Sequence, residues 1–190
     1  MLAAGLCVLA FAPQAGAGLL PSCPGTYTKP FAPWGDTAAY ALVGDGAFEG
    51  GAAGWSLAGG AKVVTGNEPF FVHGAADARS LLLPRGSSAT SPPVCMVLGR
   101  PKARLFAMAP AGSGSMRVDV MGRNLLGILS ILDGGVVSAG SRWQPTQPLS
   151  LLGSNLGSAL WATWVQLRFR PIGDATLAID DVYVDPWVIR

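Results

Sequence analysis

The sequence has few of the side chains that most often perform chemistry. Its 190 residues include a single histidine, His73, and only 13% of them are charged. We find no Ser/His/Asp set, no G-x-S-x-G motif and no phosphate-binding loop. A glycosidase would need two opposed carboxylates, and no pair among the eleven acidic residues is marked out for that role. A single histidine also argues against a zinc site. We therefore expect that the protein is not an enzyme.

Positive charge is also sparse, and the formal net charge is only +2. The densest basic group is Arg100, Lys102 and Arg104, and no aromatic residues are interleaved with it. Binding to nucleic-acid phosphates requires a concentrated basic surface. We interpret this group as a solvated strand edge and expect no nucleic-acid partner.

Helical periodicity is missing beyond the first twenty residues, whereas glycine (26) and proline (15) are abundant. Both residues interrupt helices and suit tight turns. Half of the residues are hydrophobic, which argues against disorder. The pattern predicts short strands separated by turns, at 40–43, 61–65, 80–83, 94–98, 104–108, 116–121, 126–132, 149–152, 160–170 and 176–184.

The clearest strand signal is the segment 160–170. Val165, Leu167 and Phe169 alternate there with polar residues that include Gln166 and Arg168. A period of two predicts one face in the core and one in solvent. Turn signals such as Asp133-Gly134-Gly135 separate the strands. Many short strands at this spacing predict an all-β protein built as an antiparallel β-sandwich or a barrel.

The N-terminal segment is typical of an exported protein. Residues 1–20 are apolar, and Ala15-Gly16-Ala17 fits the cleavage rule of signal peptidase, although no Lys or Arg precedes Lys29. We expect a signal peptide at 1–17, a proline-rich arm at 18–39 and the sandwich domain at 40–190. The alternative is an uncleaved membrane anchor. Cleavage would leave no membrane span and a secreted or cell-surface protein.

Two cysteines, Cys23 and Cys95, remain after that cleavage. An even number in an oxidising compartment predicts a disulfide bond, which would tie the arm to the middle of the domain. The alternative is two separate buried thiols.

Two acidic segments stand out from the rest of the sequence. Glu49 is flanked by glycines in the segment 44–50, and Asp180 and Asp181 are adjacent in the last predicted strand. Adjacent strand residues face opposite sides, so one of the two aspartates shares a face with apolar neighbours. A buried carboxylate is costly unless it is paired or bound to a cation, and oxygen ligands suit calcium. The alternative is an aspartate satisfied by a backbone amide or an arginine.

These segments carry a family resemblance. Gly44-Asp45-Gly46-Ala47-Phe48-Glu49-Gly50 with Gly54-Trp55, and Ile179-Asp180-Asp181-Val182-Tyr183-Val184, resemble the opening and closing segments of galactose-binding-like jelly rolls. That superfamily includes many carbohydrate-binding modules of bacterial glycoside hydrolases. The resemblance covers about residues 42–186 and implies a jelly-roll fold. It also implies a structural calcium ion held by Glu49 and Asp180, with Asp77 as a further candidate ligand.

Two functions follow as expectations. The first is binding of carbohydrate or a cell-surface glycan, in which Trp164, Gln166 and Arg168 on the polar face of 160–170, and Trp143, contact the sugar by stacking and hydrogen bonds. Core or edge packing is the alternative role for these tryptophans. The second is a structural or self-assembling subunit of an extracellular layer or filament, because low charge, apolar content and the arm suit self-association.

Overall fold

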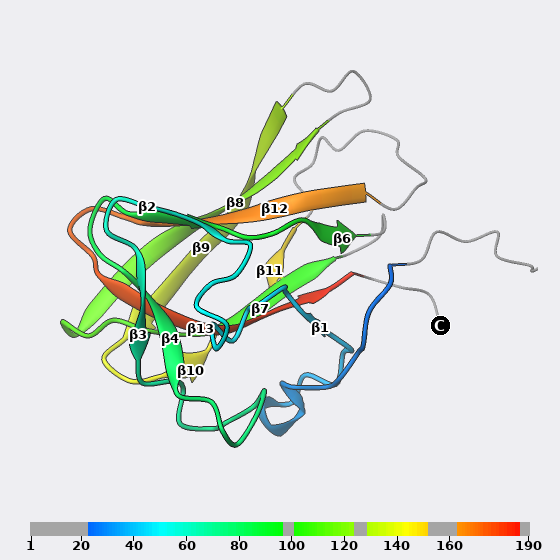
Figure 1. Cartoon of the computed structure of the whole chain (residues 1–190), viewed down its shortest axis with the longest axis horizontal. Helices are drawn as coiled ribbons and strands as arrows, with labels where there is room; N and C mark the ends of the chain where they lie inside the picture. Colours follow the sequence, from blue (N-terminus) through cyan, green and yellow to red (C-terminus); the bar gives the residue numbers. More distant parts are fainter. Residues whose placement is uncertain (1–22, 97–100, 124–128, 152–162, 187–190) are drawn as a thin grey trace, which may run out of the picture.

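The computed structural model of the chain describes residues 23–96, 101–123, 129–151 and 163–186. Two antiparallel β-sheets are stacked as a sandwich, with β7 and β13 in one layer and β8 and β12 in the other (Figure 1). The predicted signal peptide at 1–17 lies outside the described residues. Within the described ranges we find no helix with the length and apolar character that crossing a membrane requires.

The first layer, which we call the β7–β13 sheet, has the order β10-β7-β13-β4-β3, with β1 paired to β13 and β11 paired to β7. Its strands are β1 (Ala41–Leu42), β3 (Lys62–Thr65), β4 (Arg79–Leu83), β7 (Lys102–Met108), β10 (Gln144–Pro145), β11 (Leu149–Ser150) and β13 (Leu177–Asp185).

The second layer, the β8–β12 sheet, has the order β2-β5-β12-β8-β9, with β6 paired to β12. Its strands are β2 (Ser56–Ala58), β5 (Ser88–Thr90), β6 (Val94–Met96), β8 (Ser113–Arg123), β9 (Leu129–Gly140) and β12 (Thr163–Pro171). The predicted alternation in β12 is confirmed, because Val165, Leu167 and Phe169 are buried and the residues between them are more exposed.

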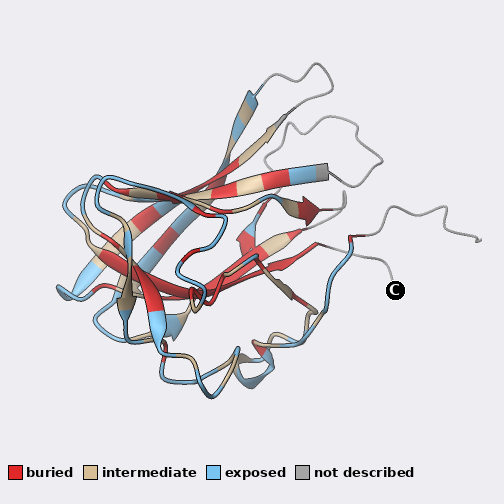
Figure 2. Ribbon diagram, viewed as in Figure 1, coloured by how far each residue is buried: buried red, intermediate tan, exposed pale blue. Residues whose placement is uncertain are grey.

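The main core fills the space between the sheets and contains buried residues of both layers. Figure 2 shows buried positions along the strands of both sheets. Leu105 and Ile179 from one sheet and Leu167 and Phe169 from the other are fully buried in it. Alternation in the long strands supplies these inward-facing residues. The sequence pattern thus leads directly to the sandwich that it predicted.

The proline-rich arm packs on its own domain. It contains the 3-10 helix η1 (Ala32–Trp34) and a bridge from Thr28 to Tyr40. Phe31 is fully buried in a second apolar cluster on the outer side of the β7–β13 sheet, with its ring centroid 5.6 Å from that of Phe106. The arm therefore covers the outer face of this sheet.

The disulfide prediction is confirmed. Cys23, at the start of the described arm, is bonded to Cys95 in β6, with a Cα–Cα distance of 5.5 Å. Both cysteines are buried. The bond joins the arm to the β8–β12 sheet, although the arm lies mainly on the other layer.

Two sequence interpretations were wrong. Arg104 does not lie on a solvated edge, because it is 5% exposed and its guanidinium is bonded to Asp36 and to the carbonyl of Thr146. Asp133-Gly134-Gly135 is not a turn between strands but a bulge within β9, opposite Val118 and Asp119. A Cβ at Gly134 would lie 2.9 Å from the carbonyl oxygen of Val118, and Gly135 has a φ of +109°, so glycine is required there for bulge geometry.

Candidate functional site

The outer face of the β8–β12 sheet carries the predicted ligand-binding side chains of β12. Trp164 is 56% exposed, which is the largest exposed fraction among the exposed large hydrophobic residues of the described chain. Gln166 follows it on the same face, and its amide donates a hydrogen bond of 2.9 Å to the carbonyl of Ser91. The neighbouring loop therefore holds the Gln166 side chain in a fixed position.

A buried carboxylate organises the middle of this face. Asp119, on β8, lies opposite Arg168 in the strand register and is only 3% exposed. Its Oδ2 accepts hydrogen bonds from Nε of Arg168 at 3.0 Å and Nε of Arg170 at 2.9 Å. One carboxylate thus holds two guanidinium groups, and these charge-assisted hydrogen bonds restrict the rotation of both arginine side chains.

Exposed apolar side chains extend the face toward the sheet edge. Ile131 lies opposite Met121, and Val136 lies opposite Arg117, so both share the outer side with the arginine network. They are 48% and 49% exposed. An exposed indole, ordered hydrogen-bonding groups and apolar surface on one rigid sheet suit a ligand that offers both hydroxyl groups and apolar ring faces.

Trp143 does not join this face. It precedes β10 in the β7–β13 sheet and packs against the cluster that contains Phe31, Tyr40 and Phe106. Its partly buried ring therefore belongs to the apolar surface on which the arm packs. The structure brings Trp164, Gln166 and Arg168 together and places Trp143 on the other layer.

Of the three predicted calcium ligands, Asp77 lies in the loop between β3 and β4 (residues 66–78, the β3–β4 loop), and Glu49 and Asp180 bond to its backbone. Glu49 Oε1 accepts hydrogen bonds of 2.8 Å from the backbone N–H groups of Ala78 and Arg79. Asp180 accepts from the backbone N–H groups of Glu68 and Asp181 at 3.0 and 2.8 Å. Backbone amides thus satisfy these carboxylates, as the alternative to calcium required, and the calcium site stays a prediction.

The β3–β4 loop contains a carboxylate that no sequence pattern marked. Glu68 is 1% exposed, and its side chain accepts hydrogen bonds from the backbone N–H groups of Phe70 and Val72. It lies beside Asp180 and Asp181, so three buried acidic groups meet at one place. The sequence did not predict a role for Glu68, because the residues around it show neither strand alternation nor the spacing of metal ligands.

Asp180 and Asp181 are both buried because β13 has an irregularity between Asp180 and Tyr183. Asp181 adopts a φ of +51°, which breaks the alternation that the sequence interpretation assumed. Burial raises the pKa of Asp180 to about 8, and hydrogen bonds and neighbouring charges change it less. Burial, together with the negative charge of Glu68, raises the pKa of Asp181 to about 7.

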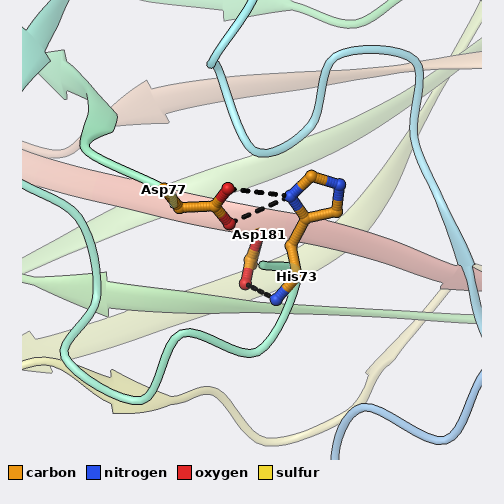
Figure 3. A group of neighbouring side chains, drawn as sticks. All are labelled: His73, Asp77 and Asp181. Carbon is orange, nitrogen blue, oxygen red and sulfur yellow. Dashed lines mark hydrogen bonds and ion pairs between the residues drawn. The ribbon is translucent and has the colours of Figure 1, made fainter. Parts of the chain in front are cut away.

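Asp77, the third predicted ligand, is close to His73 and Asp181. Its Oδ2 lies 2.9 Å from Nδ1 of His73, and Oδ2 of Asp181 accepts a hydrogen bond from the backbone N–H of His73 at 3.1 Å. Ligand atoms of these three side chains lie within 4.8 Å of one another (Figure 3). Neither Glu49 nor Asp180 belongs to this group.

No protein-family model and no curated protein sequence matches this chain. Solved structures do share its fold. The CBM22-1–GH10 modules of endo-1,4-beta-D-xylanase 10B from Clostridium thermocellum, complexed with xylohexaose, align over 77% of this chain with a TM-score of 0.56 and 13% identity. This chain spans 29% of the length of that protein.

Single modules align over most of their own length. The CBM22-1 xylan-binding domain of Paenibacillus barcinonensis Xyn10C has a TM-score of 0.53 and 15% identity, with 76% of this chain and 93% of that domain covered. The C-terminal family 22 carbohydrate-binding module of Clostridium thermocellum Xyn10B has 18% identity, a TM-score of 0.50 and the same coverage. At such identities the likeness establishes the fold, and the predicted jelly-roll sandwich is confirmed.

Proposed function

We propose that this chain is a secreted, non-catalytic carbohydrate-binding domain that recognises a polysaccharide on the outer face of the β8–β12 sheet. The observation that carries the proposal is the exposed indole of Trp164 on the same face of β12 as the ordered Asp119–Arg168–Arg170 network. A sugar ring can stack on the indole with its apolar face while its hydroxyl groups reach polar side chains. On the opposite sheet, the arm packs over part of the outer face.

The fold neighbours guide the choice of ligand. One is described as a complex with xylohexaose, and another as a xylan-binding domain. Xylan is therefore the first polysaccharide to test, followed by other β-linked glycans. Secretion is supported by the Cys23–Cys95 disulfide, because such bonds persist in oxidising compartments.

Asp119 is the one buried acid that the described residues place on this face, and two guanidinium groups engage it. Nη2 of Arg168 and Nη2 of Arg170 each lie 2.9 Å from its Oδ2. Its oxygens are therefore paired within the sheet, whereas a glycosidase needs two opposed carboxylates that can act on the substrate. The geometry thus suits binding rather than hydrolysis.

We expect Trp164→Ala to weaken binding to soluble xylan by about tenfold or more, equivalent to about 1.4 kcal/mol, because the stacking surface is lost. Affinity electrophoresis, followed by isothermal titration calorimetry, measures the effect. Phe71→Ala is the matched control, because Phe71 is also an exposed aromatic residue, at 47%, but lies in the β3–β4 loop. Equal binding by wild type and Trp164→Ala across a glycan array would rule out this face as the site.

Self-association is a second candidate, and the edge strand β9 favours it. β9 lies at the end of the order of the β8–β12 sheet and carries the exposed side chains of Leu129, Ile131 and Val136. Edge strands of this length offer backbone groups for pairing with another chain. Light scattering after size-exclusion chromatography distinguishes the candidates, and a monomer at every concentration that xylan binding requires would exclude self-assembly.

A further inference from the structure

Asp181 is an unusual residue for the middle of a strand. It has a φ of +51°, at an irregularity of β13, and only 1% of its surface is exposed. Among the described residues, its Oδ1 is the buried side-chain oxygen for which no hydrogen-bond partner is found. Leaving a buried acceptor without a partner costs on the order of 1–3 kcal/mol, and more if it is charged. Such a group calls for a partner that the polypeptide itself does not supply.

His73 and Asp77 supply the rest of a ligand set. Both come from the β3–β4 loop, and Figure 3 shows that their side chains face one another next to Asp181. Ligand atoms from all three lie within 4.8 Å of one another. The loop is held in place from both sides, because Glu49 bonds to its end and Asp180 bonds to the backbone of Glu68. The three side chains are thus presented by a fixed backbone.

The electrostatics at this position favour a cation. Asp181 interacts electrostatically with Glu68, Asp77 and Asp180, so its side chain lies in a region of concentrated negative charge. Burying like charges together is costly, and a bound cation offsets that cost. The imidazole selects among cations, because calcium takes six to eight oxygen ligands, whereas zinc and its neighbours accept nitrogen with carboxylate oxygen.

We propose that His73, Asp77 and Asp181 bind a divalent transition-metal ion of the zinc class. Zinc forms bonds of about 2.0–2.2 Å to such ligands, so the ligand atoms move somewhat closer together on binding. His73 is exposed and can make this adjustment, while Asp181 is fixed in the sheet. Three protein ligands leave a coordination position for water or another group.

The ion has access from solvent. His73 lines a groove of about 800 Å³ between the arm and the β3–β4 loop, together with Trp34, Phe70 and Tyr183. The groove lies between the arm and the β3–β4 loop, whereas Trp164 lies on β12 and lines a separate, smaller cavity with Cys23, Pro24 and Tyr27. The metal site is therefore separate from the proposed glycan face. It shares Asp77 with the predicted calcium site, but its other two ligands and its cation differ from those predicted with Glu49 and Asp180.

The single histidine makes the test direct. The full chain, purified without a polyhistidine tag and treated with chelator, is titrated with ZnCl₂ by calorimetry. We expect binding of one ion per chain and a shift of the imidazole ¹⁵N signals, which can arise only from His73. His73→Gln and Asp77→Asn should each weaken zinc binding by at least about tenfold.

A control variant separates this site from adventitious binding. Asp133→Asn removes an exposed aspartate of β9, far from the β3–β4 loop in the sequence, and should not change zinc affinity. Because His73 and Asp77 lie near the surface, their variants should fold, which thermal unfolding without metal confirms. Zinc affinity that is unchanged in His73→Gln would overturn the proposal. So would a site that calcium fills and that Asp181→Asn abolishes but His73→Gln leaves intact.

Discussion

Replacing both Cys23 and Cys95 by alanine is expected to lower the free energy of unfolding by about 4 kcal/mol at 25 °C. The bond closes a loop across a sequence separation of 72 residues, and in the chain-entropy description a loop of that length restricts the unfolded ensemble by about that amount. Urea unfolding monitored by tryptophan fluorescence, with linear extrapolation to water, gives the value. Both cysteines are buried, so alanine also leaves a little unfilled space.

Two comparisons make the result specific. The wild-type protein unfolded under reducing conditions should match the double variant, since both lack the cross-link. The slope of free energy against urea should rise in the variant, because an unfolded chain without the loop exposes more surface. A loss below about 1 kcal/mol would contradict the expectation. It would indicate that contacts of Phe31 persist in the unfolded ensemble and keep the loop closed there without the disulfide.

The features that the sequence predicted correctly depend on local pattern. The alternation of Val165, Leu167 and Phe169 was enough to orient β12, because period two leaves one arrangement with an apolar inner face. The same reasoning placed Trp164 on the outer side. The disulfide followed from counting, since the segment after the expected cleavage contains two cysteines. None of these inferences needed knowledge of a distant partner.

The features that sequence reasoning missed depend on irregular backbone or on long-range contacts. A bulge changes which residues share a face, so the two-sided argument for Asp180 and Asp181 did not anticipate that both would be buried. The backbone N–H of Glu68 donates a hydrogen bond to Asp180, which is 112 residues away in the sequence, and no local pattern predicts that contact. Three short strands, β2, β5 and β10, were likewise unpredicted, because their residues include no aromatic side chain and only one β-branched one, Thr90.

Arg104 was predicted to be solvated, but it is buried and bonded to Asp36. Substitution of Asp36 is the second change for which we expect a large loss of stability. Asp36→Asn is expected to reduce the free energy of unfolding by about 2–4 kcal/mol at pH 7. Oδ2 of Asp36 accepts hydrogen bonds from Nη1 of Arg104 at 2.9 Å and from the hydroxyl of Tyr40 at 2.8 Å. In asparagine the side-chain NH₂ group can take the position of Oδ2. The donors of Arg104 and Tyr40 would then face another donor instead of an acceptor. The Arg104 side chain is only 6% exposed and would lose the charge that compensates it.

The dependence of this effect on pH is a separate check. Burial tends to raise the pKa of Asp36, but hydrogen bonds from Tyr40, the backbone of Ala38 and Arg104 outweigh it and hold the pKa below its usual value. Because the folded-state pKa is the lower one, the carboxylate stabilises the fold above the unfolded-state value of about 4, and this contribution is lost as pH falls through the folded-state pKa. The difference between wild type and Asp36→Asn should therefore be constant near neutrality and shrink below about pH 4.

Asp174→Asn provides the matched control, because it removes one carboxylate from an ion pair of similar length, 3.0 Å to Arg85. The two side chains of that pair are 72% and 83% exposed, so solvent screens the interaction. Its loss should change the free energy of unfolding by less than about 0.5 kcal/mol. Equal effects of Asp36→Asn and Asp174→Asn, measured by urea unfolding at pH 7, would show that the buried pair contributes no more than a surface pair. The arm would then be held by its aromatic contacts, chiefly those of Phe31 with Phe106 and Tyr183.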